Sequence, residues 1–332
     1  MTTEGHADSV ITATDLVKNF GQIEAVKGID LDVRRGEIFG FLGPNGAGKS
    51  TTINILCTLM EPTAGQASVA GYDVQSHPGD VRTAIGLVFQ DPSLDVQLTA
   101  RENLQFHAFI YGVPASERSQ RIAQVLEMVE LSDRADSVVM TFSGGMKRRL
   151  EIARGMLHTP EVLFLDEPTI GLDPQTRRHI WAYLRRLRAD EGVTLFMTTH
   201  YMDEAEECDR IAIIDGGQIV ALGTPDELKA MVGGDVVTLA TADNVTAAAE
   251  ITSLFGIEPT VDNGSLRVEV TDGAEFIPRL VRETSVAVTS VSTHRPSLDD
   301  VFLKLTGHAI RAEGADTTNM MRAFMRMGGG RR

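Results

Sequence analysis

The 332-residue chain has few cysteines and no long apolar run. Cys57 and Cys208 are its only cysteines, without a CxxC spacing, so a disulfide framework is excluded and we expect two buried thiols. A membrane-spanning helix needs about 20 consecutive apolar residues, and charge, Gly or Pro interrupts every candidate run. The first residues also lack the basic flank and apolar stretch of a secretion signal. We therefore expect the chain to stay in the cytoplasm.

Basic residues are also scarce, since 31 Lys and Arg stand against 46 Asp and Glu and give a formal net charge of -15. That charge repels nucleic acid and anionic lipid, so an anionic ligand must be held by a local site. The 42% of apolar and 23% of charged residues are close to the averages for soluble globular proteins. The length favours one large domain and a smaller one.

The N-terminal third contains a strand, a glycine loop and a helix in succession. Short β-branched runs between Val10 and Phe41 predict strands, and Glu37 to Leu42 is apolar enough to be buried. The glycine-rich segment 43–51 follows directly. Apolar residues at helical spacing, up to Leu59, then predict a helix that continues to Glu61-Pro62.

Helical periodicity dominates residues 98–158, which follow a short strand at Ile85 to Phe89. Two apolar stripes on either side of Gly112-Val-Pro114 predict two amphipathic helices, and we interpret both stripes as core. The stripes consist of Leu104, Phe106, Phe109 and Ile110, and of Ile122, Val125, Leu126 and Val129. This segment is predicted to be a helical insertion.

Continuous apolar strands are predicted at Glu161 to Leu165 and Val193 to Thr198, on either side of a helix from Gln175 to Arg188. This alternation implies crossover connections and a parallel sheet, with ligands at the strand ends.

A small α+β domain with the order βαββαβ is predicted after Gly233-Gly234. We place the large domain at 1–232, the small domain at 233–306 and a disordered tail at 307–332. The expected elements are strand Val236 to Leu239, helix Val245 to Phe255, a hairpin at Asn263-Gly264, helix Glu275 to Arg282, strand Ser285 to Val291 and helix Leu298 to Thr306.

The glycine segment has the spacing of a phosphate-binding loop, set by Gly43, Gly48, Lys49 and Ser50. Backbone N–H groups at a helix N-terminus can surround the phosphates of ATP, and Lys49 would neutralise the β and γ phosphates. Ser50 would offer its hydroxyl to Mg²⁺, while Thr51 would be a capping or backbone partner. The expected nucleotide-binding residues are Gly43, Pro44, Asn45, Gly46, Ala47, Gly48, Lys49, Ser50 and Thr51.

Two carboxylates, Asp166 and Glu167, end the apolar strand before Pro168. By themselves they would indicate a simple turn, but a phosphate loop on the same sheet favours catalysis. Asp166 can reach the Mg²⁺ shell, and Glu167 can polarise a water for in-line attack on the γ phosphate.

Phe142-Ser-Gly-Gly-Met-Lys-Arg-Arg-Leu150 resembles the signature motif of ABC transporter ATPases. Ser143 and the N–H groups of Gly144 and Gly145 would open a helix and form a second anion site. The resemblance implies a P-loop ABC cassette of the α/β class, with a mixed, mainly parallel core sheet, an N-terminal antiparallel β subdomain and a helical insertion. It also implies a head-to-tail homodimer, in which each signature closes on the ATP held by the other copy.

The remaining family landmarks follow in order across residues 8–230. Gln90 resembles the residue that senses Mg²⁺ and the attacking water, and Ile170-Gly-Leu-Asp173 resembles the loop that crosses the dimer interface. His200 resembles the switch histidine that contacts the γ phosphate. Phe20 resembles the aromatic that stacks on adenine, although by itself it would be interpreted as core.

Two features indicate the subfamily of ABC ATPases that the chain resembles. Met146 stands where many members have glutamine, which removes one polar contact near the nucleotide. Arg295-Pro-Ser-Leu-Asp-Asp-Val-Phe-Leu303 is similar to the C-terminal motif of daunorubicin-resistance ATPases, which power drug and lipid export through a separate permease. This motif would assist dimerisation or dock the permease. Alternatively, it is a capped helix that closes the small domain, with Leu298, Val301, Phe302 and Leu305 inward.

The leading hypothesis is an ATP-hydrolysing subunit of an exporter of drug-like or lipid-like substrates, peripheral at the cytoplasmic face of the membrane. A groove near Gln90 to Gln97 would receive a short helix of the permease. An importer is disfavoured because import ATPases more often end in a β-barrel domain. A soluble ABC ATPase acting on ribosomes or DNA is disfavoured by the single cassette and the acidic charge.

Overall fold

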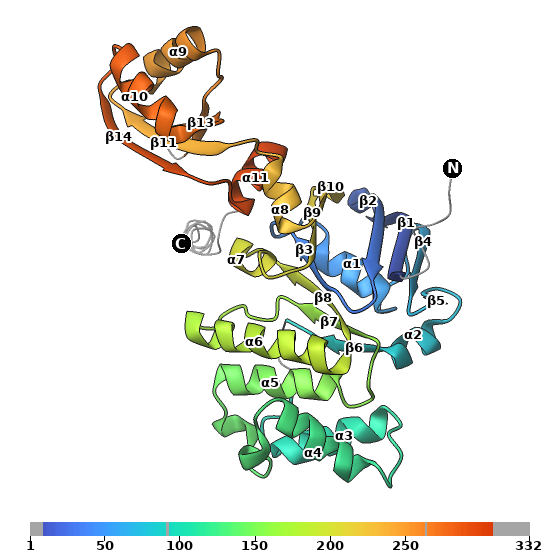
Figure 1. The fold of residues 1–332 in the computed structure, drawn as a ribbon. Coiled ribbons are helices and arrows are strands. Elements are labelled where there is room, and N and C mark those ends of the chain that lie inside the picture. Colours follow the sequence, from blue (N-terminus) through green and yellow to red (C-terminus); the bar gives the residue numbers. More distant parts are fainter. Residues whose placement is uncertain (1–8, 91–92, 263, 308–332) are drawn as a thin grey trace, which may run out of the picture. The chain divides into compact units, whose positions relative to one another are not determined.

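The computed structural model describes residues 9–90, 93–262 and 264–307. It divides into two compact units, one made of the described residues up to Leu222 and one that begins at Gly223 (Figure 1). Each unit has a hydrophobic core of its own. The predicted disordered tail lies outside the described residues from position 308 onward, as do Asp91 and Pro92 of the predicted permease groove.

A six-stranded sheet forms the centre of the first unit, in the order β10-β9-β3-β8-β7-β6 (Figure 1). β3 pairs in parallel with β8 and β9, and β7 pairs in parallel with β6 and β8. Every residue of β3 and β8 is buried, as expected for parallel strands that are covered on both faces. The parallel sheet is therefore confirmed. Its strands are β3 (Ile38–Leu42), β6 (Ile85–Val88), β7 (Val162–Asp166), β8 (Thr194–Thr199), β9 (Arg210–Asp215) and β10 (Gln218–Gly223).

A four-stranded sheet in the order β2-β1-β4-β5 forms the second layer of this unit, and its neighbouring strands are antiparallel. Ile11 and Val26 of this sheet share one core with Phe39 and Phe164 of the parallel sheet. The predicted N-terminal antiparallel subdomain is confirmed, although only its first two strands were assigned from sequence. The strands are β1 (Ser9–Phe20), β2 (Ile23–Arg34), β4 (Ala64–Val69) and β5 (Tyr72–Asp73).

Helices surround the parallel sheet, and three of them gather in the predicted helical insertion (Figure 1). α3 begins with a capping box between Thr99 and Glu102, and α6 begins with the side chain of Asp173 as its N-cap. The insertion contains α3 (Ala100–Ile110), α4 (Arg118–Met128), the short helices η1 (Ser132–Arg134) and η2 (Val139–Thr141), and α5 (Gly144–Gly155). The other helices are α1 (Lys49–Leu56), α2 (Pro78–Ala84), α6 (Pro174–Glu191) and α7 (Met202–Ala205).

The helix after the glycine loop is shorter than predicted. It ends at Leu56, because Cys57 is its C-cap and Thr58 takes a left-handed φ of 60°. Leu59, which the periodicity placed in the helix, is 54% exposed. The predicted continuation to Glu61-Pro62 is therefore wrong.

The first apolar stripe of the insertion is only partly core. Leu104 is fully buried, but Phe106, Phe109 and Ile110 are 58%, 67% and 56% exposed. The buried face of α3 is instead formed by Ala100, Asn103, Leu104 and Ala108. The core interpretation is therefore wrong for the three exposed residues, whereas the second stripe is buried as predicted.

The second unit begins with a helix that was not predicted, α8, and then has the predicted element order and one antiparallel sheet, β12-β13-β11-β14. Val237, Leu266 and Ile251 belong to its core. Its strands are β11 (Asp235–Thr241), β12 (Thr260–Asp262), β13 (Ser265–Val270) and β14 (Val288–His294), and its helices are α8 (Pro225–Ala230), α9 (Asn244–Phe255), α10 (Gly273–Glu283) and α11 (Leu298–Thr306).

α11 carries the C-terminal motif and is held by its own cap. Ser297 and Asp300 form a capping box, and Asp300 also pairs with Arg267 and with His294 Nε2, the latter at 3.1 Å. Leu298, Val301 and Phe302 are buried as predicted, but Leu305 is 38% exposed, so its inward placement is wrong.

Within the described part of the chain, every helix is too short or too polar to cross a bilayer. Cys57 and Cys208 are both buried and free, which confirms the sequence prediction, and burial raises the pKa of both thiols.

Candidate active site

The glycine loop connects β3 to α1 and needs its glycines. Gly46 and Gly48 have φ values of 82° and 108°, which side chains with a Cβ rarely adopt. A Cβ at Gly43 would lie 2.3 Å from the carbonyl oxygen of Ile214. The loop can therefore approach its neighbours closely only with glycine at these positions.

A cavity of about 370 Å³ opens beside this loop. Seven of the nine predicted loop residues line it, whereas Gly43 and Ala47 are buried behind it. Its lining is Ala25, Pro44, Asn45, Gly46, Gly48, Lys49, Ser50, Thr51, Gln90 and Glu167. The structure thus brings the loop together with Gln90 and Glu167, which are far from it in sequence.

Lys49 is the cation of this cavity. Its Nζ donates hydrogen bonds to the carbonyl oxygens of Gly43, at 2.7 Å, and Pro44, at 3.2 Å. The same Nζ lies 3.4 Å from Oε1 of Glu167, and both side chains are largely buried. Thr52, the next threonine after Thr51, donates its hydroxyl to the carbonyl oxygen of Gly48 at 2.9 Å.

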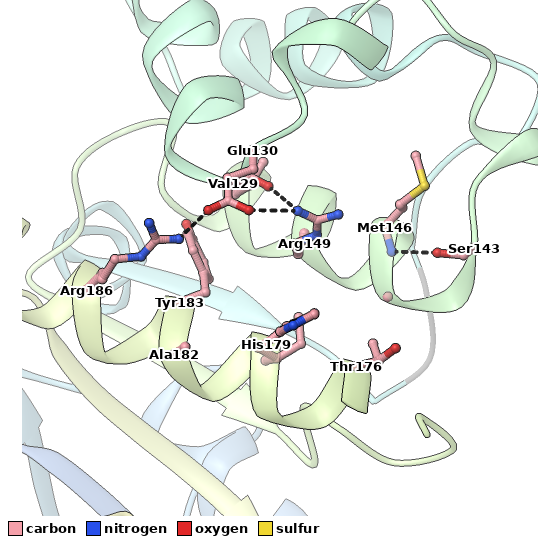
Figure 2. Close-up of a pocket in the computed structure, with 12 residues that line it drawn as sticks. Val129, Glu130, Ser143, Met146, Arg149, Thr176, His179, Ala182, Tyr183 and Arg186 are labelled. Atoms are coloured by element: carbon pink, nitrogen blue, oxygen red, sulfur yellow. Dashed lines mark hydrogen bonds and ion pairs between the residues drawn. The ribbon is translucent and has the colours of Figure 1, made fainter. Parts of the chain in front are cut away.

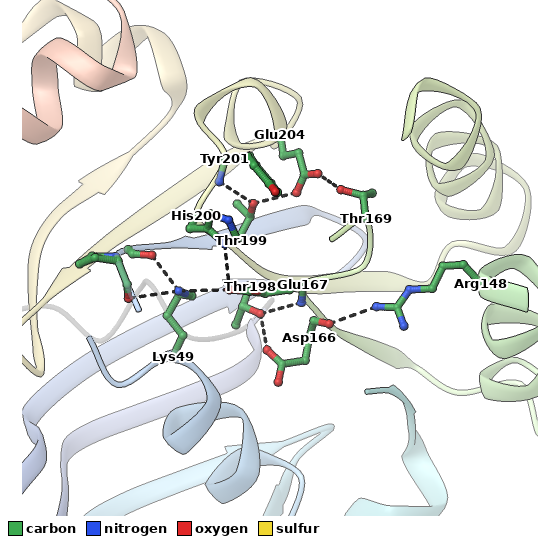
Figure 3. Close-up of polar contacts among 12 residues, drawn as sticks. Lys49, Arg148, Asp166, Glu167, Thr169, Thr198, Thr199, His200, Tyr201 and Glu204 are labelled. Atoms are coloured by element: carbon green, nitrogen blue, oxygen red, sulfur yellow. Dashed lines mark hydrogen bonds and ion pairs between the residues drawn. The ribbon is translucent and has the colours of Figure 1, made fainter. Parts of the chain in front are cut away.

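Glu167 stands just beyond β7 in an unusual backbone conformation (Figure 3). Its φ is 44°, and its N–H donates to Oγ1 of Thr198 at 3.0 Å. Thr198 in turn donates to Oδ1 of Asp166 at 2.5 Å. Such left-handed conformations of non-glycine residues cluster at functional sites.

The side chain of Glu167 is held as a carboxylate. Its Oε1 lies 3.1 Å from Nδ1 of His200, which follows β8. Burial raises the pKa of Glu167, but the hydrogen bond from His200 and the charge of Lys49 outweigh it, so the pKa lies below its ordinary value. An ionised carboxylate at this point can act as a general base.

A buried carboxylate, Glu204 of α7, joins the segments that follow β7 and β8 (Figure 3). It accepts hydrogen bonds from the hydroxyls of Thr169 and, at 2.7 Å, Thr199. Burial raises the pKa of Glu204. Because Thr199 precedes His200 and Thr169 follows Glu167 by two residues, this contact fixes both segments.

The predicted signature residues lie at the start of α5. Ser143 is the N-cap, its Oγ accepts from the N–H of Met146 at 3.3 Å, and Gly144 and Gly145 form the first turn. A Cβ at Gly145 would lie 2.4 Å from Cγ2 of Thr176, so α5 approaches α6 closely at this glycine. The amides of the first turn are thus exposed at a helix N-terminus.

A second cavity of about 370 Å³ lies between α5 and α6 and includes Ser143, Gly145 and Met146 (Figure 2). Glu130 closes one end, with Oε1 at 2.6 Å from Nη2 of Arg186 and Oε2 at 3.7 Å from Nη1 of Arg149. This cavity shares no lining residue with the cavity at the glycine loop. The two predicted phosphate sites of one chain are therefore separate.

Besides Gly43 and Ala47, five predicted residues lie outside both cavity linings, and two of them, Gly144 and His200, are described above. Phe20, at the end of β1, is 47% exposed, with Nζ of Lys18 at 5.3 Å from its ring centre. Asp173 caps α6 by accepting from the N–H groups of Gln175 and Thr176, both at 3.0 Å. Asp166 accepts the hydrogen bond of Thr198 described above.

Arg148, Glu204 and Thr198 were not predicted from the sequence. Arg148 and Glu151 have opposite charges at i and i+3 within α5, a spacing that could have indicated a pair. Glu204 and Thr198 carry no comparable signal, because their partners come from distant segments.

A glycine loop after a parallel strand, with a buried Lys49 and an ionised Glu167 beside His200, defines a P-loop ATPase of the ATP-binding cassette class. A family model described as ABC transporter matches residues 26–170, and one for the C-terminal domain of DrrA1-3-like ATP-binding proteins matches 223–306. The chain belongs to the daunorubicin-resistance type of ABC transporter ATP-binding proteins, and it is an ATPase.

Two curated relatives are similar in sequence to this chain over most of its length. The daunorubicin resistance ATP-binding protein DrrA3 of Streptomyces coeruleorubidus is 41% identical over 315 residues, which cover 93% of this chain and 99% of the relative. The linearmycin resistance ATP-binding protein LnrL of Bacillus subtilis is 39% identical over 311 residues, covering 91% and 100%.

Solved structures of ATP-binding cassettes are similar to a large part of this chain. CbiO1 of Clostridium perfringens, part of an ABC transporter complex, has a TM-score of 0.64 at 27% identity and covers 75% of this chain and 96% of its own. A dimeric ATP-binding cassette in a post-hydrolysis state, bound to ADP and Pi, has a TM-score of 0.58 at 30% identity and covers 64% and 98%.

Proposed function

We propose that this chain powers the export of a drug-like or lipid-like substrate through a separate membrane permease, by binding ATP with Mg²⁺ and hydrolysing it as a homodimer. The observation that carries the catalytic part is the contact of Glu167 with both Lys49 and His200 in the loop cavity. The resistance proteins among its relatives support export, and so does the α+β fold of the second unit, which is not a β-barrel.

The loop cavity fits a nucleotide triphosphate. Backbone N–H groups of segment 43–51 would bind the β and γ phosphates, together with Nζ of Lys49. Glu167 would take a proton from the attacking water, and His200 would contact the γ phosphate. Phe20 would stack its exposed ring on the adenine.

The oxygen donors near this cavity fit Mg²⁺. The Ser50 hydroxyl, the Gln90 side-chain amide and the Asp166 carboxylate are the oxygen ligands that Mg²⁺ prefers. The described residues contain no group of three or more His, Cys, Asp or Glu that could hold a metal. A site whose ligands come partly from the protein and partly from the phosphates suits Mg²⁺, which commonly binds with substrate phosphates. When bound, the ion would neutralise charge on them.

A second copy of the chain would complete the site. The signature residues Ser143, Gly144 and Gly145 present helix N-terminal amides, but in a cavity separate from the chain's own loop. Head-to-tail pairing would place them against the phosphates held by the partner, with Asp173 at the interface. The dimeric, nucleotide-bound cassette among the structural relatives supports this arrangement.

The permease would bind the exposed apolar residues of α3. Phe106, Phe109 and Ile110 are more than half exposed and come from one helix of the insertion. Exposed apolar groups of this size are typical of protein contact sites, and a short apolar helix of a permease suits this surface. The subunit would therefore work as a peripheral protein at the cytoplasmic face of the membrane.

The experiment that tests this function is the variant Glu167→Gln, purified with its permease. We expect hydrolysis to fall at least about a hundredfold, as for the loss of a general base, while ATP with Mg²⁺ still binds. Light scattering would then show an ATP-loaded dimer. Glu127→Gln, on the exposed face of α4, is the matched control. Normal hydrolysis by Glu167→Gln would overturn the assignment of the base.

A further inference from the structure

We propose that Arg148 is a positioning residue that holds Glu167 in place for catalysis and connects it to the segment around Gln90. This inference rests on the proposed role of Glu167 as general base. Arg148 lies on α5, only five residues beyond Ser143, but its side chain turns away from the signature cavity toward the end of β7 (Figure 3).

The guanidinium of Arg148 is almost completely buried, and it contacts three backbone carbonyls. Nε donates to the carbonyl oxygen of Pro168 at 2.6 Å, and Nη2 donates to that of Asp166 at 3.1 Å. These carbonyls belong to the residues immediately before and after Glu167. Arg148 thereby holds the backbone on both sides of the base.

This support matters because Glu167 has a left-handed backbone, with a φ of 44°. A non-glycine residue keeps such a conformation only when its surroundings fix it. Thr198 accepts the N–H of Glu167 at 3.0 Å, and Arg148 binds the two flanking carbonyls. Together these bonds fix the direction in which the carboxylate points.

The same guanidinium reaches the segment that contains Gln90. Nη1 of Arg148 donates to the carbonyl oxygen of Phe89 at 2.5 Å and to Oε2 of Glu151 at 3.0 Å. Oε1 of Glu151 accepts from the N–H of Ser93 at 2.8 Å. The residues at positions 89 and 93, on either side of Gln90, are therefore both held by α5.

Only arginine can make this set of contacts. Its planar guanidinium has five N–H donors in a rigid fork, whereas lysine has one compact ammonium group. Three separate carbonyls and one carboxylate surround the Arg148 side chain. A displacement of α5 or of the Gln90 segment therefore acts on the carbonyls beside Glu167, and the base responds to both the signature helix and the Gln90 segment.

The test is Arg148→Lys in the full chain, assayed with and without its permease in detergent or nanodiscs. We expect kcat to fall about tenfold or more, with KM for ATP changed less than about threefold, because the phosphate loop is untouched. Stimulation of hydrolysis by the permease is expected to be lost. Arg121→Lys is the matched control, because Arg121 of α4 also donates to backbone carbonyl oxygens, those of Leu157 at 3.1 Å and Met156 at 2.6 Å, but lines neither cavity.

The outcomes separate the two proposals. An Arg148→Lys protein with the kcat and permease stimulation of the original chain overturns this inference, and so does an equal loss in Arg121→Lys. Normal hydrolysis by Glu167→Gln overturns the proposed base instead. Arg148→Lys keeps a cation opposite Glu151. It therefore tests the role of Arg148 even where a neutral variant such as Arg148→Gln does not fold. The midpoint of thermal unfolding is expected to fall, because buried carbonyl oxygens lose their donors, while ATP binding stays near the original value.

Discussion

Nζ of Lys49 lies 3.4 Å from Oε1 of Glu167, so the cation that would bind phosphate and the base that would activate water are paired. A triphosphate in the loop cavity would compete for Lys49 with its own charge. The bound nucleotide would thus loosen the pair and leave Glu167 to His200 and the water. The proposed ATP would therefore replace the contact between Lys49 and Glu167.

Lys49→Ala is expected to weaken ATP binding at least about tenfold, because charge-assisted hydrogen bonds contribute about 1.5 to 3 kcal/mol each. The measurement is equilibrium binding of a fluorescent ATP analogue. Unchanged affinity would contradict the role of Lys49 in phosphate binding.

His200→Ala is expected to move the acid limb of the kcat/KM profile to higher pH. Burial raises the pKa of Glu167, and the His200 hydrogen bond is the largest effect that lowers it. In the original chain the carboxylate stays ionised down to its depressed pKa, and without His200 it takes up a proton at a higher pH. The pH profile of the residual hydrolysis measures this shift, and a shift toward lower pH would refute the explanation.

Thr199→Val is expected to lower the free energy of unfolding by about 1 to 3 kcal/mol, because the buried Glu204 loses one of its two hydroxyl donors. It is also expected to lower kcat, since Thr199 directly precedes His200. Urea unfolding and ATPase assays provide the measurements. Thr252→Val is the control, because its hydroxyl bonds to Ala248 on the exposed face of α9, where substitutions change stability within about 0.5 kcal/mol.

Serine at both Phe106 and Ile110 is expected to abolish co-purification with the permease. Both residues are more than half exposed, so thermal stability and basal hydrolysis are expected to stay near the original values. Leu254→Ser, on an exposed position of α9, is the control. Intact permease binding by the double variant would place the contact elsewhere.

Asp300→Ala is expected to destabilise the second unit by about 3 to 5 kcal/mol, because it removes the buried carboxylate between Arg267, His294 and the cap of α11. Calorimetry of the full chain measures the loss. This structural role accounts for much of the C-terminal motif. Deletion of 295–306 tests the remaining hypothesis, since complexes that assemble normally without it would exclude a role in dimerisation or permease docking.

The proximity of Glu167 to His200 was predictable because of a rule of geometry. Asp166 and Thr199 end neighbouring parallel strands, and the carboxyl ends of such strands meet at one edge of the sheet. Glu167 and His200 follow these ends directly, so a motif on each strand was enough to bring them together. The glycine loop was predictable for the same reason, since β3 pairs with β8.

Other features had no readable signal. Apart from Glu151, the partners of Arg148 are backbone carbonyls, which every residue has, so the sequence cannot indicate them. Periodicity identified an apolar face on α3, but it does not say whether that face packs against the same chain, and Phe106 shows that it does not. β4 and β5 are short and lack strong alternation, so the pairing of β4 with β1 and of β5 with β4 decides their structure.

The separation of the loop cavity from the signature cavity has a consequence for the cell. A single copy would carry one half of each of the two ATP sites of the homodimer and would complete neither. In dilute solution the total rate of ATP hydrolysis would rise with the square of the chain's concentration, and a permease that binds two copies would raise this rate. Copies made in excess of the permease would then hydrolyse little of the cell's ATP.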